Sequence, residues 1–387
     1  MSKLVLSFEK IKLTDTERCG GKAAGLGELT RAGVRVPGGF CVTGDALTRV
    51  IEANGLGQEI AGIAAGLNFE DYLGVEEQTG KIRTLIAAAM IPSDLDSDIR
   101  AHYSRLVTKT QKYVAVRSSV SVKNSPVSSF PGMMDTYHYV VGEEQVLEKV
   151  RECWASLWTA RAAFARHRQK LAHENGVIAP IVQLMVDSYS AGVFFSANPI
   201  TKNLNEMVIE SNWGLGESVV SGKSMNDFFA LDKATLAIKQ KRIVEKTVMV
   251  TMDDSGAGRA EKPVPADRAH APSISDKEAV EIGTIGKRIE KHFGFNVDVE
   301  WAYQDKILYI LQTRRVRGLD DAPHTPAATK TIAATPARPL KKAGKKAAKK
   351  PARKPAKKSA KKPAKKQATR KKPAKKKPAK KKPAKKR

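Results

Sequence analysis

The chain has 387 residues and a formal net charge of +28, from 68 Lys and Arg against 40 Asp and Glu. Residues 331–387 hold 27 of the basic residues and no Asp or Glu, so removing them leaves 41 basic against 40 acidic residues. The basic character therefore belongs to the C-terminal end and gives no indication of what the first 330 residues bind. No stretch approaches the ~18 consecutive apolar residues that a membrane-spanning helix needs, so we expect no membrane partner.

The chain uses few cysteines. Cys19, Cys41 and Cys153 lie far apart and form no CxxC or Cys/His metal motif. Three cysteines cannot all pair within one chain, so we expect a reduced, cytoplasmic environment. The apolar run at the N-terminus is interrupted by Glu9 and Lys10, which is not typical of a signal peptide.

Composition divides the chain into three zones. Residues 1–318 alternate helix-like and strand-like segments and predict an α+β domain, residues 319–339 a Pro/Ala/Thr linker, and residues 340–387 a Lys/Ala/Pro tail. The expected elements follow in chain order: a helix over 23–32 closed by Gly33, a buried strand over 113–117, one or two amphipathic helices over 143–172, strands over 181–186, 192–196 and 207–211, a surface loop over 253–273, a helix over 276–292 ended by Gly294, and a hairpin with strands over 297–303 and 307–314.

Two glycine-rich segments are candidates for close approach to a ligand. In residues 20–28 (GGKAAGLGE), glycines precede a helix start, where backbone N–H groups favour anions, and Lys22 would add a mobile positive charge. The segment lacks the GK[ST] ending of a Walker A motif, and an ordinary helix start is the alternative. The turn 213–217 (WGLGE) either approaches a ligand, with Glu210 and Glu217 as metal or ribose contacts, or simply connects a strand to a helix.

A second candidate follows the buried strand over 113–117. Arg117 comes at its end, then Ser118, Ser119 and a Ser/Pro/Gly-rich loop that finishes in PGMMDT at 131–136. Glycine lets the backbone approach a ligand closely, and free N–H groups in such loops can cradle phosphates. The alternative is an ordinary strand followed by a flexible loop.

The hairpin near residue 300 is the most informative segment. In its first strand (VDVEWAY), alternation places Asp298 and Glu300 on one face and Val297, Val299 and Trp301 on the other. The second strand (ILYILQTRR) continues the same separation of polar from mainly apolar side chains.

In that second strand, Gln312 and Arg314 share one face. The side chains on the opposite face are Ile307, Tyr309, Leu311 and Thr313. If a three-residue turn pairs Tyr303 with Ile307, then Asp298 faces Gln312, and a slip by one residue would scatter the cluster.

Two carboxylates, an amide and a guanidinium on one face suit a Mg–nucleotide site. Mg²⁺ usually takes one or two carboxylates together with phosphate oxygens. Arginine binds phosphate oxygens in a fork and stabilises the charge of a transferring phosphoryl group. A half-exposed hairpin whose polar groups meet solvent is the alternative.

Seven ordered motifs together resemble the nucleotide-binding domain of the pyruvate phosphate dikinase and phosphoenolpyruvate synthase family, which includes rifampicin phosphotransferase. Between residues 20 and 314 they are GGKAAGLGEL with VPGGF, VAVRSS, PGMMDT, CWASLWTARA, QLMVDS with SAGVFFSANPIT, IESNWGLGESVVSG, and DVEWA with LYILQTRR. The chain departs from the family pattern at Lys123 and Asn124, where acidic residues often stand, and at Arg315, which takes the place of a proline.

The resemblance implies an ATP-grasp-like fold, with ATP held between two lobes over roughly 1–180 and 181–318. It implies Arg117 and Arg314 as catalytic phosphate contacts. The implied contacts to ATP are Lys22, Arg117, Gly132, Thr136, Gln183, Glu300, Gln312 and Arg314. The implied ligands of Mg²⁺ are Asp298, Glu300 and Gln312.

The resemblance also implies a phosphoryl acceptor. The family passes phosphate to a histidine on a swivelling domain, in a Gly/Thr/Ser-rich motif that ends in His-Ala. None of the seven histidines, at positions 102, 138, 167, 173, 270, 292 and 324, has that context. We therefore expect an ATP-dependent phosphotransferase, a kinase, whose acceptor in trans is a separate phosphohistidine-domain protein or a small molecule. The alternatives are a non-catalytic module that senses ATP or AMP, and a nucleic-acid-compacting protein whose folded domain only spaces the tails.

The tail over 340–387 is predicted to be disordered, because it has dense like charge, repeated prolines and almost no large apolar residues. It resembles the tails of linker histones and bacterial histone-like proteins. Lysine neutralises phosphates without reading sequence, so we expect nonspecific, salt-dependent binding to DNA, RNA or polyphosphate and an association with the nucleoid. A merely solubilising tail is the alternative.

Overall fold

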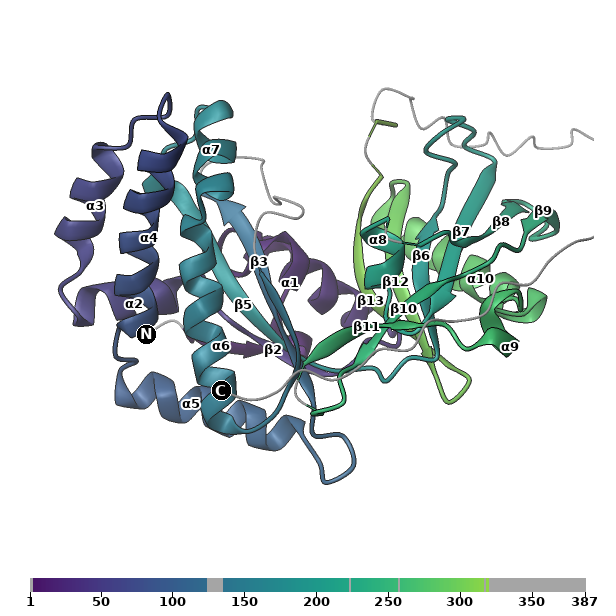
Figure 1. Cartoon of the computed structure of the whole chain (residues 1–387), viewed down its shortest axis with the longest axis horizontal. Coiled ribbons are helices and arrows are strands. Elements are labelled where there is room, and N and C mark those ends of the chain that lie inside the picture. Colours follow the sequence, from purple (N-terminus) through teal and green to yellow (C-terminus); the bar gives the residue numbers. More distant parts are fainter. Residues whose placement is uncertain (1–2, 124–134, 223, 257, 317, 320–387) are drawn as a thin grey trace, which may run out of the picture. The chain divides into compact units, whose positions relative to one another are not determined.

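A computed structural model describes residues 3–123, 135–222, 224–256, 258–316 and 318–319. These residues all belong to one unit, Met1–Pro326. It contains helices packed on β-sheets, so the expected mixture of helix and strand is confirmed (Figure 1). Gly132, most of the predicted linker and the whole predicted tail lie outside the described residues.

The first sheet is antiparallel and has the strand order β1-β2-β5-β3-β4. Its strands are β1 (Val5–Ser7), β2 (Gly39–Val42), β3 (Val114–Val122), β4 (Thr136–Val140) and β5 (Gly176–Leu184). The central pair, β3 and β5, runs in register from Val114 opposite Leu184 to Val122 opposite Gly176. Both predicted strands in this sheet are therefore longer than the apolar runs that indicated them.

Helices cover this sheet: α6 packs against β3 and β5, and α4 lies beside α6 (Figure 1). The helices are α2 (Gly44–Ala53), α3 (Gly57–Ala65), α4 (Tyr72–Ala88), α5 (Ser93–Leu106), α6 (Glu143–Ala155) and α7 (Ala160–Arg168). Short 3₁₀ helices cover Phe8–Lys10, Leu13–Asp15, Ser156–Trp158 and His173–Asn175. The predicted helical stretch over 143–172 is thus α6 and α7 with one 3₁₀ turn between them. Trp154 and Trp158 from this stretch are buried in the core, as the helical spacing indicated.

Helix α1 (Thr16–Arg31) contacts β3 and β5 of the first sheet and β13 of the second. Gly20 interrupts it with φ +74°, a backbone conformation that side chains disfavour. A Cβ at residue 20 would lie 2.3 Å from Ser119 Oγ and 2.5 Å from the Ser119 carbonyl carbon. Glycine is therefore required here, and the helical turn that carries Lys22 begins directly against β3. The helix ends just before Gly33, which has φ +67° and marks the end that was expected.

The second sheet is also antiparallel, in the order β13-β12-β6-β7-β8-β9. Its strands are β6 (Ser190–Phe195), β7 (Glu206–Trp213), β8 (Asp227–Asp232), β9 (Ile238–Arg242), β12 (Val297–Gln304) and β13 (Ile307–Arg315). Helix α10 (Asp276–Phe293) packs on it, and the short α8 (Glu217–Val220) contacts β6 and β7. Ser275 and Glu278 form a capping box at the start of α10, and Gly294, with φ +72°, ends it as predicted.

The expectation of a surface loop over 253–273 is wrong. β11 (Arg259–Pro263) pairs with β10 (Val248–Met252) in a two-stranded sheet, and α9 (Ala266–Ala269) follows. The strand was missed because its sequence, RAEKP, has no large apolar residue, and its side chains are exposed or only half-buried. Such a strand carries no alternating apolar signal.

The predicted hairpin of β12 and β13 forms, but its register differs from the expected one. Gln304 pairs with Ile307, so the expected pairing of Tyr303 with Ile307 is wrong. The turn has two residues, Asp305 and Lys306, with φ +52° and +61°. Positive φ at both central residues is the geometry that lets a two-residue turn follow the twist of the strands.

A β-bulge then changes the register within the hairpin. Trp301 pairs with Ile310, whereas Glu300 pairs with Gln312, which leaves Leu311 as the extra residue. Leu311 lines the same cavity as Glu300. The expectation that Leu311 lies on the opposite face is therefore wrong, because alternation does not persist through a bulge.

The three cysteines are buried and free. Within the ranges described above, no helix is long and apolar enough to cross a membrane.

Candidate functional site

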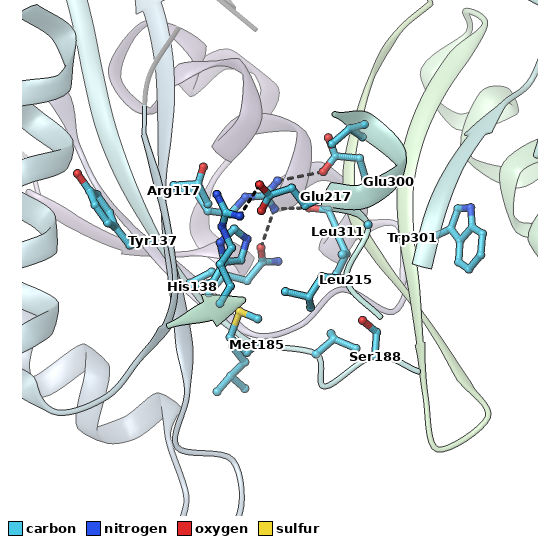
Figure 2. A pocket seen from close by; sticks show the side chains of 18 of the residues that line it. Arg117, Tyr137, His138, Met185, Ser188, Leu215, Glu217, Glu300, Trp301 and Leu311 are labelled. Carbon is cyan, nitrogen blue, oxygen red and sulfur yellow. Dashed lines mark hydrogen bonds and ion pairs between the residues drawn. The ribbon is translucent and has the colours of Figure 1, made fainter. Parts of the chain in front are cut away.

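A cavity of about 510 Å³ lies where residues of both sheets come together (Figure 2). One end of it is apolar, lined by Leu184, Met185, Val186 and Leu215. The other end is polar and includes Arg117, Thr136 and Glu300. A concave site with an apolar wall and a few converging charged groups is typical of a small-molecule site.

Arg117 is the central charged group of this cavity. Its Nη1 donates to Gln183 Oε1 at 3.2 Å and to the Leu311 carbonyl oxygen at 3.0 Å. Its Nη2 donates to Glu300 Oε2 at 3.1 Å and to Gln312 Oε1 at 3.2 Å. The side chain is only 13% exposed, so this guanidinium is largely shielded from water and joins the two sheets through the hairpin.

The hairpin contributes two polar pairs on the face that looks toward Arg117. Gln312 Nε2 donates to Glu300 Oε1 at 2.9 Å, and Arg314 Nε donates to Asp298 Oδ2 at 2.6 Å. The four polar side chains therefore do cluster, as the alternation indicated. Asp298 faces Arg314, however, so its expected pairing with Gln312 is wrong, and the bulge and shorter turn explain the change.

Lys22 lies near this cluster, at the start of the helical turn that follows Gly20. Its ammonium has no hydrogen-bond or ion-pair partner among the residues that the structure describes. Burial, and then the nearby Arg117 guanidinium, lower the pKa of Lys22 from 10.5 to about 7. Among the described residues, Lys22 is thus a cation without a partner, which favours an anionic ligand beside it.

Three further residues were predicted to contact ATP, and two of them line the cavity. Thr136 lies opposite Arg117 in the β3–β4 pair and lines the cavity. Gln183 lines it too, but both ends of its amide are engaged, since Nε2 donates to the Pro37 carbonyl oxygen at 3.3 Å. Gly132 lies outside the described residues.

The hairpin oxygens fit the donor set that Mg²⁺ prefers. Asp298, Glu300 and Gln312 offer two carboxylates and an amide carbonyl, all of them hard oxygen donors on one sheet face. The described part of the chain holds no group of three or more His, Cys, Asp or Glu side chains arranged for a metal. A metal here would therefore share its coordination with oxygens brought by a ligand, as Mg²⁺ does with phosphates.

Sequence reasoning missed two features of the cavity. One is His138, which lines the cavity from β4. Alternation along TYHYV places His138 on the same face as Thr136, so this pattern could have identified it. The other is Arg259, which lines the cavity and forms an ion pair at 2.7 Å with Glu217, a residue that the sequence had indicated as a possible contact. Arg259 had no signal, because it lies in β11, where a loop was expected.

Comparison with known proteins identifies the class to which this fold belongs, a nucleotide-binding domain. Residues 16–333 match the family model described as pyruvate phosphate dikinase, AMP/ATP-binding domain. The chain belongs to this family, so the family resemblance predicted from the seven motifs is confirmed.

Similar proteins carry more specific names. The chain is 36% identical over 361 residues to a probable phosphoenolpyruvate synthase of Pyrococcus horikoshii, covering 82% of this chain and 44% of that protein. It is 36% identical over 357 residues to the phosphoenolpyruvate synthase of Pyrococcus furiosus, covering 81% and 44%. For a probable phosphoenolpyruvate synthase of Methanocaldococcus jannaschii the identity is 39% over 320 residues, covering 82% and 27%. The chain thus spans less than half the length of each of these relatives.

Proposed function

We propose that the cavity binds MgATP in an ATP-grasp-like manner, with the triphosphate at its polar end and the base at its apolar end. The observation that carries this proposal is the arrangement around Arg117, which draws Glu300 and Gln312 of the hairpin to β3. Glu300 and Gln312 lie 183 and 195 residues from Arg117 in the sequence, and both accept hydrogen bonds from its guanidinium. A hairpin with a merely structural role would not require a buried arginine at that position.

The charges around the polar end favour a triphosphate. Among the described residues, Lys22 has no partner and Arg314 donates only from Nε, to Asp298, which leaves the terminal nitrogens of Arg314 for a phosphate. In this proposal Lys22, Arg117 and Arg314 neutralise the phosphates, and Thr136 and Gly132 bind phosphate oxygens. Gln183 lies beside the base, next to Leu184 and Met185.

Asp298, Glu300 and Gln312 would hold Mg²⁺ in this proposal. When bound, the ion would neutralise phosphate charge and orient the phosphate oxygens. Arg314 and Arg117 hold Asp298 and Glu300 in place through hydrogen bonds. Charged groups fixed in advance need little reorganisation when nucleotide binds.

The proposed reaction is ATP-dependent phosphoryl transfer, a kinase-type step, in which Arg117 and Arg314 stabilise the charge of the moving phosphoryl group. The relatives named phosphoenolpyruvate synthase support this class of reaction. The acceptor in this proposal is a group supplied in trans, on a phosphohistidine-domain protein or a small molecule. The alternative is a sensor that binds ATP or AMP without turning it over.

Binding and turnover measured on the same preparation separate the two functions. Isothermal titration with MgATP, followed by an assay of ³²P transfer to candidate acceptors, is expected to show both binding and transfer. Binding without transfer to any acceptor would favour the sensor. Absence of binding would contradict both.

We further propose that residues 340–387 bind polyanions such as DNA, RNA or polyphosphate. The support is the run of lysines without acidic residues, which neutralises phosphates irrespective of sequence. A chain truncated after Gly318 is expected to lose DNA retention at 50 mM salt and to keep ATP binding. Unchanged DNA retention by the truncated chain would contradict this role.

A further inference from the structure

His138 occupies an irregular position in β4. Arg117 pairs with Thr136 and Val116 with Tyr137, but the next registered pair is Val114 with Val140. Two residues, His138 and Tyr139, therefore oppose the single residue Ala115, which is a β-bulge. Tyr139 has φ +56°, a conformation that residues other than glycine, asparagine and aspartate rarely adopt.

The bulge directs two successive side chains toward the same side of the sheet. Tyr139 packs with Leu215 and Val250 and meets the ring of Tyr113 edge to face. His138 lines the cavity beside Arg117 (Figure 2). Bulges and strained backbone are concentrated at functional sites, where they re-aim a side chain at the cost of local stability.

The imidazole of His138 has no hydrogen-bond partner among the described residues, and its Nδ1 is buried. A buried polar atom without a partner destabilises the protein, so such atoms call for an explanation. An enclosed lone pair is more easily tolerated than an enclosed N–H. The favoured tautomer therefore carries its proton on Nε2, the ring nitrogen farther from the backbone, where a ligand in the cavity can accept it.

The ring is neutral at physiological pH. Burial is the first cause that lowers the pKa of His138 to about 3, followed by the nearby charges of Arg117, Arg259 and Lys22. A neutral imidazole can donate one N–H without adding charge to a site that already holds these cations. Its natural partner is an acceptor oxygen that arrives with the ligand.

The position of His138 along β4 indicates which oxygen that is. Thr136, two residues before it, lies opposite Arg117 at the polar end, and Tyr139 after it packs against Leu215 of the apolar end. In a nucleoside triphosphate, the sugar and the α-phosphate lie between the base and the terminal phosphates. We propose that the imidazole N–H of His138 donates a hydrogen bond to the α-phosphate of the bound nucleotide. This inference rests on the proposed function of the cavity.

The test compares four ligands by isothermal titration of the full chain: adenosine, AMP, ADP and ATP. His138→Leu removes the hydrogen bond and is expected to weaken AMP, ADP and ATP by the same factor, about tenfold, and to leave adenosine unchanged. His138→Gln, whose amide N–H reaches about as far as Nε2, is expected to stay within about threefold of the wild type for AMP. Every variant carries the same basic tail, so phosphate binding by the tail cancels in these ratios.

Two further measurements separate this role from a structural one. Thermal unfolding without ligand is expected to show His138→Leu at least as stable as the wild type, because the substitution removes an unpartnered buried atom. His270→Leu, at an exposed histidine, is the matched control and should leave all four affinities unchanged. If His138→Leu bound AMP, ADP and ATP as tightly as the wild type, or lost as much affinity for adenosine as for AMP, the inference about His138 would be overturned and the proposed function would stand. A wild-type chain that binds none of the nucleotides would overturn the proposed function and this inference with it.

Discussion

Nucleotide affinity is expected to fall as the pH rises above 7, because Lys22 loses its proton there. Burial, then Arg117, and more weakly Arg314 lower the pKa of Lys22 to about 7, whereas Glu300 and Cys153 act in the opposite direction. A triphosphate bound beside Lys22 favours the charged ammonium and raises this pKa toward its ordinary value of 10.5. The charged form is thus preferred in the complex, so affinity is fully present below pH 7 and is lost at higher pH.

The size of the effect follows from the fraction of Lys22 that is protonated in the free protein. That fraction is about one half at pH 7 and about one hundredth at pH 9, so affinity should fall about fiftyfold between these values. At pH 8, binding should take up about 0.9 proton. Titration calorimetry in two buffers with different ionisation enthalpies measures this uptake directly. MgATP itself keeps a constant charge over this range.

A matched variant isolates Lys22. Lys22→Arg keeps the positive charge at every pH in the range, so its affinity should not depend on pH between 7 and 9. A wild-type affinity that stays constant from pH 7 to 9, or a variant that keeps the full wild-type dependence, would refute the assignment of Lys22 to the triphosphate.

Three further predictions concern the hairpin and the core. Arg314→Ala should abolish phosphoryl transfer while circular dichroism shows an intact fold, and equal ³²P transfer by variant and wild type would count against it. Glu300→Gln should raise the Mg²⁺ concentration needed for half-maximal ATP binding about tenfold or more, because one carboxylate ligand is lost, and an unchanged requirement would argue for metal ligands elsewhere. Lys246→Met should lower the free energy of unfolding by about 3–5 kcal/mol in urea titrations, because it leaves the fully buried Asp227, 2.7 Å from Lys246 Nζ, without its cation. Lys239→Met, at an exposed ion pair, should change it little, and an equal loss in both variants would contradict the importance of burial.

The sequence carried enough information to predict the elements that have a strong apolar pattern. Helix α10 has a capping box at one end and Gly294 at the other, and its bounds agree with the prediction within one residue. The hairpin of β12 and β13 alternates clearly, so Asp298 and Glu300 could be placed on one face. Arg117 contacts a hairpin residue 183 positions away, and only the family resemblance indicated that the two lie in one site. Alternation predicts which side chains share a face of a strand, but not which other element packs against that face.

The features that were missed have weak local signals. A bulge adds one residue to a strand without a distinctive sequence, so the extra residue Leu311 and the pairing of Asp298 with Arg314 could not be derived from alternation. β11 has no large apolar residue, so its sequence resembles that of a loop. The low pKa of Lys22 depends on burial and on Arg117, which are properties of the folded chain alone.

The central claim is that ATP binds between Arg117 and the acidic hairpin. A crystal structure of the chain with Mg²⁺ and a non-hydrolysable ATP analogue tests it most directly. The predicted result is a triphosphate in contact with Lys22, Arg117 and Arg314, with the metal held by side chains of the β12–β13 hairpin. Electron density for the nucleotide anywhere else, with this cavity filled only by water, would contradict it.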